Sequence, residues 1–321
     1  MTSWGIARRL LAIDVLTMAF MSALAAGTIA LAAQIPEWWA VVGLCVLVGA
    51  GVPLLAWLRA HLDLGVVRFL HDWSFPLSVY VIYRAVLLAA GSSHGGHVYD
   101  GGLIVADRWL FGTDPTVWLS RFTHPVVTEL LQLSYALFYL LPVAVGVELY
   151  LGGRESQFRR WVFVCGCGFY LSYVGYLVLP AVGPRLTLHD IGATARDLPG
   201  LPGLWLTSSL RTLIDGGGMV PAGIAPEVAI RLAPRDAFPS GHALITIVTI
   251  FWAWRFRMWV RWFVTVAGGL LLLATVYLRY HYVVDVLAGA VLAALCIGLA
   301  PVVHTWLARQ LGTIDAELKE H

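Results

Sequence analysis

Charged residues are scarce in this chain. Asp, Glu, Lys and Arg make up 12% of its 321 residues, whereas they make up about 25% of a soluble globular protein. Hydrophobic residues account for 59%, so the composition excludes a soluble protein and predicts an integral membrane protein. The net charge is only +2, and we therefore expect no nucleic acid or other polyanion as a partner. The partners that remain are lipid substrates in the bilayer, and the oligomeric state is left open.

Cysteine and lysine are also rare. Lys319 is the only lysine, and all four cysteines lie in apolar segments: Cys45, Cys165, Cys167 and Cys296. Cys165 and Cys167 are too close on a helix for an ordinary disulfide, and packed thiols are a better interpretation than a redox or metal site. No metal or cofactor is expected.

Long apolar runs dominate what remains. A membrane-spanning helix needs about 20 mostly apolar residues, and eight segments approach this length, the sixth being short. They are Leu11–Ala33, Trp39–Leu58, Phe75–Ala90, Val126–Leu151, Trp161–Ala181, His242–Trp254, Trp262–Leu278 and Val283–His304. The first follows Arg8 and Arg9 as a signal peptide would, but its length favours a retained anchor. The fold class is therefore an all-α, polytopic transmembrane helix bundle of about eight spans.

Basic residues in the short loops favour cytoplasmic N and C termini. This orientation places Pro239–His242 and Arg279–His281 on the extracytoplasmic face of a cell membrane. Two further outer segments are expected: an interfacial amphipathic helix within Leu103–Phe122 and a Gly- and Pro-rich lid over Val182–Ser240. The predicted divisions are N-terminal spans over 1–100, a catalytic membrane domain over 101–303 and a cytoplasmic tail over 304–321.

Two histidines and an aspartate stand at the edges of these spans. Ionisable residues are costly there, which makes them candidates for function. His281 and Asp285 are four apart, so on a helix they share a face, and the carboxylate can fix the imidazole tautomer. That pair suits a nucleophile with its orienting group, although packing of a neutralised histidine explains it equally well.

The segment Pro239–His242 favours the functional interpretation. Ser240 can cap the helix that follows, and the free N–H groups at Gly241 and beyond form an anion site. His242 beside such a site can protonate a leaving oxygen. The alternative is an ordinary capped helix start.

Together the two motifs resemble those of the type 2 phosphatidic acid phosphatase superfamily. Within it, Thr275–Asp285 most resembles the inositol phosphorylceramide synthase branch, and Leu179–Arg185 resembles related bacterial proteins, which suggests a bacterial source. The resemblance covers roughly Asp107–Pro301. It implies that His281 attacks phosphorus to form a phosphohistidine, that Asp285 orients His281, and that His242 acts as general acid and then base, without a metal.

The chain departs from the phosphatases of this superfamily at one point. Many of them carry Ser-Arg where this chain has Ala274 and Thr275, so one phosphate-binding arginine is missing. Arg185 is the best replacement. Arg279 and Arg235 follow, and each of these two serves equally well as an interfacial anchor.

The departure favours a lipid phosphotransferase that moves a phospho-head group, such as phospho-inositol, to a lipid or sugar alcohol. An extracytoplasmic phosphatase for lipid or polyprenyl phosphates is the alternative. A lipid transporter fits less well, because no inverted repeat is visible. His94 and His97, with Asp100 nearby, could bind a metal, but a Gly-rich turn is the preferred interpretation.

Overall fold

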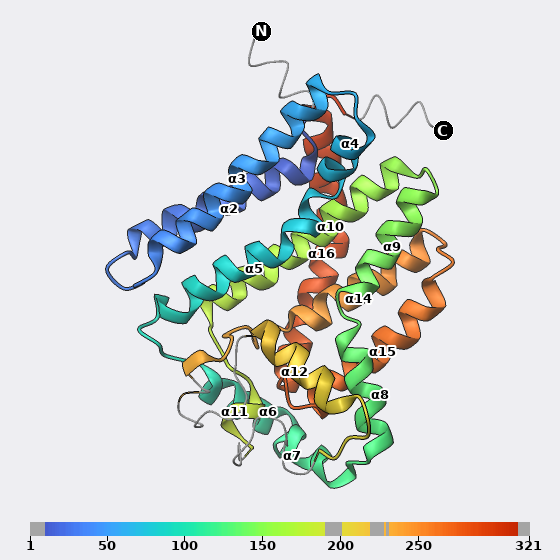
Figure 1. The fold of residues 1–321 in the computed structure, drawn as a ribbon. Coiled ribbons are helices and arrows are strands. Elements are labelled where there is room, and N and C mark those ends of the chain that lie inside the picture. The colour runs from blue at the N-terminus through green and yellow to red at the C-terminus, as the bar shows by residue number, and fades with distance from the viewer. Residues whose placement is uncertain (1–9, 190–200, 219–227, 229–230, 314–321) are drawn as a thin grey trace.

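The computed structural model describes residues 10–189, 201–218, 228 and 231–313. Within these ranges the chain is helical and has no strand, so the predicted all-α class is confirmed (Figure 1). Several predicted features lie outside the described residues. They are Arg8 and Arg9, Lys319 with the last residues of the predicted tail, and parts of the predicted lid at 190–200, 219–227 and 229–230.

In the part of the chain that the structure describes, five helices are long and apolar enough to cross a membrane, or six if one bent pair counts as a span. The five are α2 (Ala12–Ala30), α3 (Trp38–His61), α5 (Ser74–Ser93), α10 (Glu155–Val178) and α16 (Val283–Gln310). The bent pair is α8 (Pro125–Ala136) and α9 (Leu140–Leu151), which follow one another with a bend of 49° between them. Helices also form at the other two predicted spans, as α14 (Gly241–Arg255) and α15 (Arg261–Tyr277), but both are shorter. The total of eight spans therefore stays a prediction. α16 itself continues to Gln310, past the predicted start of the tail.

Helix α10 lies at the centre of the bundle and packs against α5, α14 and α16. Small residues make this close packing possible. A Cβ at Gly168 would overlap the side chains of Leu244 and Ile245, and a Cβ at Gly175 would overlap Pro239. Since α10 touches α14 at Gly168 and touches Pro239 of the preceding loop at Gly175, that loop is fixed against the core.

A hairpin of α2 and α3 extends from one side of the bundle (Figure 1). A buried polar network ties its base to the short helix α4 (Gly65–Asp72). Asp14 contacts Nε2 of His71 at 2.9 Å, and Arg59 pairs with Asp72 at 2.5 Å. Buried charges are tolerated when they are paired, as they are here.

The short helices gather at one end of the molecule, at the bottom of Figure 1. They are α6 (Asp100–Phe111), α7 (Pro115–Leu119), the 3₁₀ turn η1 (Ser120–Phe122), α11 (Pro184–Thr187) and α12 (Thr207–Gly218). In α6 the buried side chains Asp100, Leu103 and Asp107 recur at helical spacing, whereas Trp109 is exposed. α6 thus has the amphipathic character predicted for this segment, but two of the three residues on its buried stripe are carboxylates.

Candidate active site

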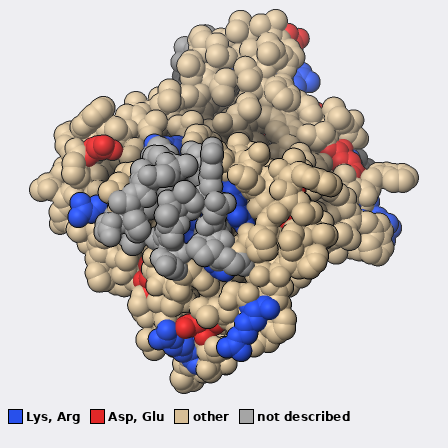
Figure 2. Space-filling view, turned by 60° about the horizontal axis from the view of Figure 1, so that its bottom comes forward, with Lys and Arg blue, Asp and Glu red and all other residues tan. Residues whose placement is uncertain are grey.

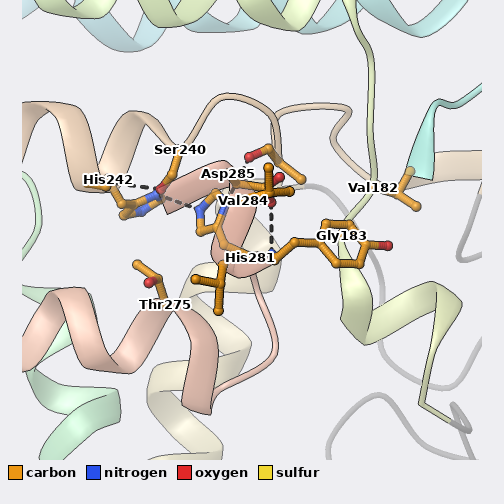
Figure 3. A network of polar contacts seen from close by, with 12 residues as sticks. Val182, Gly183, Ser240, His242, Thr275, His281, Val284 and Asp285 are labelled. Carbon is orange, nitrogen blue, oxygen red and sulfur yellow. Dashed lines mark hydrogen bonds and ion pairs between the residues drawn. The ribbon is translucent and has the colours of Figure 1, made fainter. Parts of the chain in front are cut away.

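His281 lies in the tight connection between α15 and α16 (Figure 3). The connection is held by the carbonyl of Thr275, which accepts the backbone N–H groups of Tyr280 at 3.0 Å and His281 at 2.9 Å. Arg279 adopts a left-handed backbone conformation with φ of 67°, which is uncommon for a residue other than glycine. The chain therefore reverses within a few residues and presents His281 at the start of α16.

Hydrogen bonding defines the tautomer of His281. Its Nδ1 lies 2.8 Å from the carbonyl oxygen of Ala237 and 3.5 Å from Oδ2 of Asp285. A carbonyl oxygen can only accept, so Nδ1 carries the proton, and the lone pair of a neutral ring lies on Nε2. This Nε2 faces Nδ1 of His242 at 3.4 Å (Figure 3). The Ala237 carbonyl, which sequence reasoning missed, is thus a closer partner of His281 than the predicted Asp285.

Asp285 joins the two motifs. Its Oδ2 accepts the backbone N–H of Tyr282 at 2.8 Å, and its backbone carbonyl accepts the N–H of Ser240 at 3.0 Å. Ser240 is the N-cap of α14, as the sequence predicted, because its hydroxyl accepts the N–H of Ala243 at 3.2 Å. His242 therefore sits in the first turn of α14, opposite His281.

A stack of aromatic rings positions His242. Its ring lies 4.5 Å from that of Tyr135 at an angle of 21°, and Tyr135 stacks in turn on Tyr280 at 4.4 Å. The guanidinium of Arg185 lies 5.7 Å from the centre of the Tyr280 ring, within range of a cation–π contact. The stack thus links Arg185 of α11 to His242 of α14 along one wall of the site.

Several arginines gather at the same end of the molecule. Figure 2 views that end and shows basic side chains at the edge of the segment drawn in grey. Burial, and then the charge of Arg211, lowers the pKa of Arg279. The backbone N–H of Arg185 donates to the carbonyl of Arg279 at 2.9 Å. Arg211 and Arg279 thus lie within electrostatic range of each other, and the backbone of Arg185 adjoins that of Arg279, although sequence reasoning had not selected Arg211. Basic side chains gathered at one end of a protein favour a bound anion.

Arg235 makes different contacts. Its Nη1 donates to the carbonyls of Arg231 and Ala233, each at 3.3 Å. A Cβ built on Gly91 would lie 3.9 Å from the same nitrogen. The contacts of Arg235 therefore lie in its own loop and against the end of α5.

Two carboxylates of α6 support the loops that carry the candidate site residues, and the sequence did not single out their roles. Asp107 accepts the N–H groups of Val283 at 3.0 Å and Val284 at 2.8 Å, the first residues of α16. Asp100 accepts the N–H groups of Val182 at 3.0 Å and Gly183 at 2.8 Å. Burial raises the pKa of Asp107 more than these hydrogen bonds lower it. α6 therefore holds both the start of α16 and the loop that leads to Arg185.

His94 and His97, the weaker candidates for a metal site, make contacts within the fold. His94 contacts the carbonyl of Leu177 at 2.9 Å and the hydroxyl of Tyr99 at 3.2 Å, and His97 packs edge-on against Tyr99. Within the described residues, no group of three or more His, Cys, Asp or Glu side chains is arranged to hold a metal ion. At the position where many phosphatases of the superfamily carry an arginine, the hydroxyl of Thr275 donates to the carbonyl of Leu272 at 2.6 Å.

Comparison with known proteins agrees with the resemblance drawn from the motifs. The family model of the PAP2 superfamily matches residues 101–299. A PA-phosphatase related-family protein of Dictyostelium discoideum is 25% identical over 197 residues, which cover 55% of this chain and 32% of that protein. Inositol phosphorylceramide synthase of Candida albicans is 28% identical over 190 residues, 57% of this chain and 38% of that protein. The match thus spans about a third of each relative's length, 32% of one and 38% of the other. No solved structure matches.

Proposed function

Because the chain belongs to the PAP2 superfamily, whose members are phosphatases or phosphotransferases, we propose that it is a membrane lipid phosphotransferase. It moves a phospho-head group, with phospho-inositol among the candidates, to a lipid or sugar alcohol. The observation that carries the proposal is the orientation of His281, whose Nε2 lone pair faces His242. The likeness to inositol phosphorylceramide synthase supports transfer over hydrolysis.

In the first step, Nε2 of His281 attacks the phosphorus of the donor lipid. A P–N bond forms, and the P–O bond to the leaving alkoxide breaks as His242 donates a proton to that oxygen. The proton on Nδ1 of His281 stays against the carbonyl of Ala237, 2.8 Å away. The nucleophile is therefore held in one tautomer throughout.

In the second step, the acceptor hydroxyl attacks phosphorus. His242 takes the hydroxyl proton, and the P–N bond breaks with its electron pair returning to Nε2 of His281. We assign stabilisation of the phosphoryl oxygens to the N–H groups at the start of α14, after Ser240, and to the guanidiniums of Arg185 and Arg279, whose backbones adjoin each other. Asp285 holds the backbone that carries His281.

The experiment is to expose the purified protein to a ³²P-labelled short-chain phosphatidylinositol in detergent and to measure an acid-labile phosphoenzyme. His281→Ala should remove both phosphoenzyme and turnover, by roughly 10⁴-fold or more. His242→Ala should slow turnover by about 10²–10⁴-fold and should accumulate phosphoenzyme when the donor has a good leaving group. A fully active His281→Ala protein would refute the mechanism.

Hydrolysis is the second candidate, because the Dictyostelium discoideum relative is named for PA-phosphatase. The same site would then accept water in the second step. The two functions separate by product: hydrolysis releases inositol phosphate from the labelled phosphatidylinositol, or inorganic phosphate from a phosphatidate donor, whereas transfer yields a phospholipid whose yield rises with added alcohol. A lipid transporter would give neither product and no phosphoenzyme.

A further inference from the structure

An open polar pocket of about 370 Å³ lies where α3 ends, α4 begins and α10 begins. It is lined by Arg59 of α3, Arg68 of α4 and Glu155 of α10, and by the loop between α3 and α4, which includes Leu62 and Leu64. All of its lining except Glu155 precedes residue 101, where the family match begins. The pocket therefore belongs to a part of the chain for which the family match does not account.

The pocket and the histidines lie at opposite ends of the bundle. Helix α10, a candidate span, connects the two: Glu155 at its start lines the pocket, and Gly175 near its end packs against Pro239, three residues before His242. The roughly 20 residues from Glu155 to Gly175 rise about 30 Å, which is about the thickness of the hydrocarbon core of a bilayer. Figure 1 agrees, with α4 at the top and the short helices around the site at the bottom. The pocket thus lies at the other membrane boundary.

The two arginines of the pocket are held differently. Arg59 is fixed, because its Nη1 pairs with Asp72 at 2.5 Å and lies 3.1 Å from Nδ1 of His71. A guanidinium has five N–H donors, and these contacts of Arg59 involve Nη1 alone. Arg68 is 57% exposed and reaches Asp63 only at 4.0 Å. An anion in the pocket would therefore meet a rigid guanidinium and an exposed one.

The other ionisable side chains of the pocket leave these donors available. The side chain of Asp63 is fully exposed to solvent, and Glu155 pairs with Arg159 at 3.2 Å, one turn along α10. His61 turns back onto its own helix, where its Nδ1 lies 2.8 Å from the carbonyl oxygen of Trp57. The charge of Arg68 is therefore the one that these groups neutralise least.

The start of α4 adds backbone donors. Leu64 is the N-cap of α4 and makes no side-chain cap hydrogen bond. The first N–H groups of a helix have no partner within it, so those of Gly65 and Val66 are left without a side-chain cap. Backbone N–H groups at a helix start and guanidiniums both bind phosphate oxygens. The polar lining of the pocket thus suits a phosphate group.

An exposed apolar stripe runs along α4 from the pocket. Val66, Phe69 and Leu70 recur at helical spacing and are exposed, as are Leu62 and Leu64 at the pocket itself. The opposite side of α4 is buried against the bundle. A short amphipathic helix at a membrane boundary lies with its apolar face among lipid chains. The region therefore accommodates a phosphate group and hydrocarbon chains next to each other.

We propose that this pocket binds the phosphate of an anionic phospholipid whose chains lie along the apolar stripe of α4, at the membrane boundary opposite the candidate active site. This lipid is a bound ligand and not a substrate of His281, so the inference does not depend on the proposed phosphotransfer. Arg59 also contacts His71, whose Nε2 lies 2.9 Å from Asp14 of α2. The lipid thus fastens the base of the α2–α3 hairpin.

The test follows amide hydrogen exchange of residues 62–70 in the full-length protein in dodecyl maltoside. Dioctanoyl phosphatidylglycerol should slow exchange there. Dioctanoyl phosphatidylcholine has the same chains and a phosphate but no net charge, and should require about tenfold more lipid. Inorganic phosphate at the same concentration should have no effect. Equal protection by inorganic phosphate would indicate a site for the free anion, and no protection by phosphatidylglycerol would indicate no site; either result would overturn the proposal.

A matched pair of arginine variants locates the lipid. Arg68→Gln should raise the half-saturating lipid concentration about fivefold, the effect of one basic residue near a charged membrane surface. Arg255→Gln is the control: Arg255 is exposed in the last turn of α14 and does not line the pocket. It lies at the same end of the bundle, because the carbonyl of its neighbour Phe256 accepts from Arg154 at 2.8 Å. Equal weakening by both variants would show only general attraction to basic residues and would refute the pocket.

A third variant, Leu64→Asp, separates binding from folding. A carboxylate at the N-cap supplies the cap that α4 lacks, and its charge repels a phosphate. The variant should therefore need at least about tenfold more phosphatidylglycerol for protection, while its melting temperature without lipid stays at or above that of the wild type. Protection at the wild-type lipid concentration would contradict the placement of the phosphate at the start of α4.

Discussion

Replacing Asp107 by alanine tests whether α6 holds the catalytic end of α16. The carboxylate is 1% exposed and accepts two backbone N–H groups, those of Val283 and Val284. Alanine leaves both donors without their acceptor, directly before Asp285 in the chain and two residues or more after His281. Asparagine keeps one acceptor oxygen but removes the charge at the start of the helix.

The expected loss of folding free energy follows from those two N–H donors. A buried N–H without a partner costs about 1–3 kcal/mol, and loss of a helix cap costs about 0.5–2 kcal/mol. Burial of the carboxylate offsets part of its benefit, as its raised pKa indicates. We therefore expect Asp107→Ala to lose about 2–4 kcal/mol and Asp107→Asn to lose about half of that. In melting temperature the alanine variant should fall by roughly 5–10 °C.

The assay compares melting temperature in detergent with kcat for phosphoryl transfer. Asp114→Ala serves as the matched control, because Asp114 lies in the same outer segment but pairs with the exposed Arg108 at 2.8 Å. An exposed ion pair contributes about 0–1 kcal/mol. Asp107→Ala should therefore lower both melting temperature and kcat well beyond Asp114→Ala. If the two variants behave alike, Asp107 does not hold α16 and the reasoning is wrong.

Three further outcomes are expected. Gly241→Ala should remove most activity, because the added Cβ would overlap the hydroxyl of Tyr176. Adding Tyr176→Phe to this variant should restore part of the activity, and the absence of any rescue would contradict the steric explanation. Arg211→Ala should raise the KM of the donor about tenfold with a smaller change in kcat, and an unchanged KM would exclude Arg211 from phosphate binding. Burial, and then the charge of Arg279, lowers the pKa of His189 to about 4, so neutral His189 stabilises the fold fully above its unfolded pKa of about 6.5 and loses this contribution toward pH 4. The melting temperature of His189→Gln should therefore fall less steeply than that of the wild type between these pH values, and parallel curves would contradict the assignment.

The parts of the site that sequence reasoning anticipated are local. Ser240 caps α14 because a hydroxyl next to a helix start has donors within three residues. The spacing of His281 and Asp285 places both at one turn, and apolar length predicts the helices. That spacing suggested an imidazole held by Asp285, yet the carbonyl of Ala237 lies closer to Nδ1. A backbone carbonyl has no signature in the sequence, so this partner could not be foreseen.

Three acidic residues show why other contacts in the fold and the site could not be predicted from the sequence. Asp107 bonds the backbone at Val283 and Val284, 176 and 177 residues further along the chain, and Glu148 bonds that of Trp259 and Val260, 111 and 112 residues further along. Glu129 likewise accepts N–H groups around Thr207, at the start of α12. In each case the carboxylate lies on one helix and its donors lie at or near the start of another. No sequence periodicity relates the carboxylate to its distant donors. The composition shows only that charged residues are scarce, not which of them pair with a helix start.

That scarcity nevertheless has a physical consequence. The first N–H groups of a helix lack partners within it, and at a membrane boundary water satisfies them less readily than in solution. At the start of α16, Asp285 accepts only one backbone N–H, that of Tyr282, and the next two residues, Val283 and Val284, have no side-chain acceptor of their own, so their N–H groups need a carboxylate from elsewhere. Asp107 supplies it from α6, and in doing so fixes the turn that carries His281. In a chain with so few charged residues, a buried acid beside a helix start should therefore be tested as part of the site before it is assigned a purely structural role.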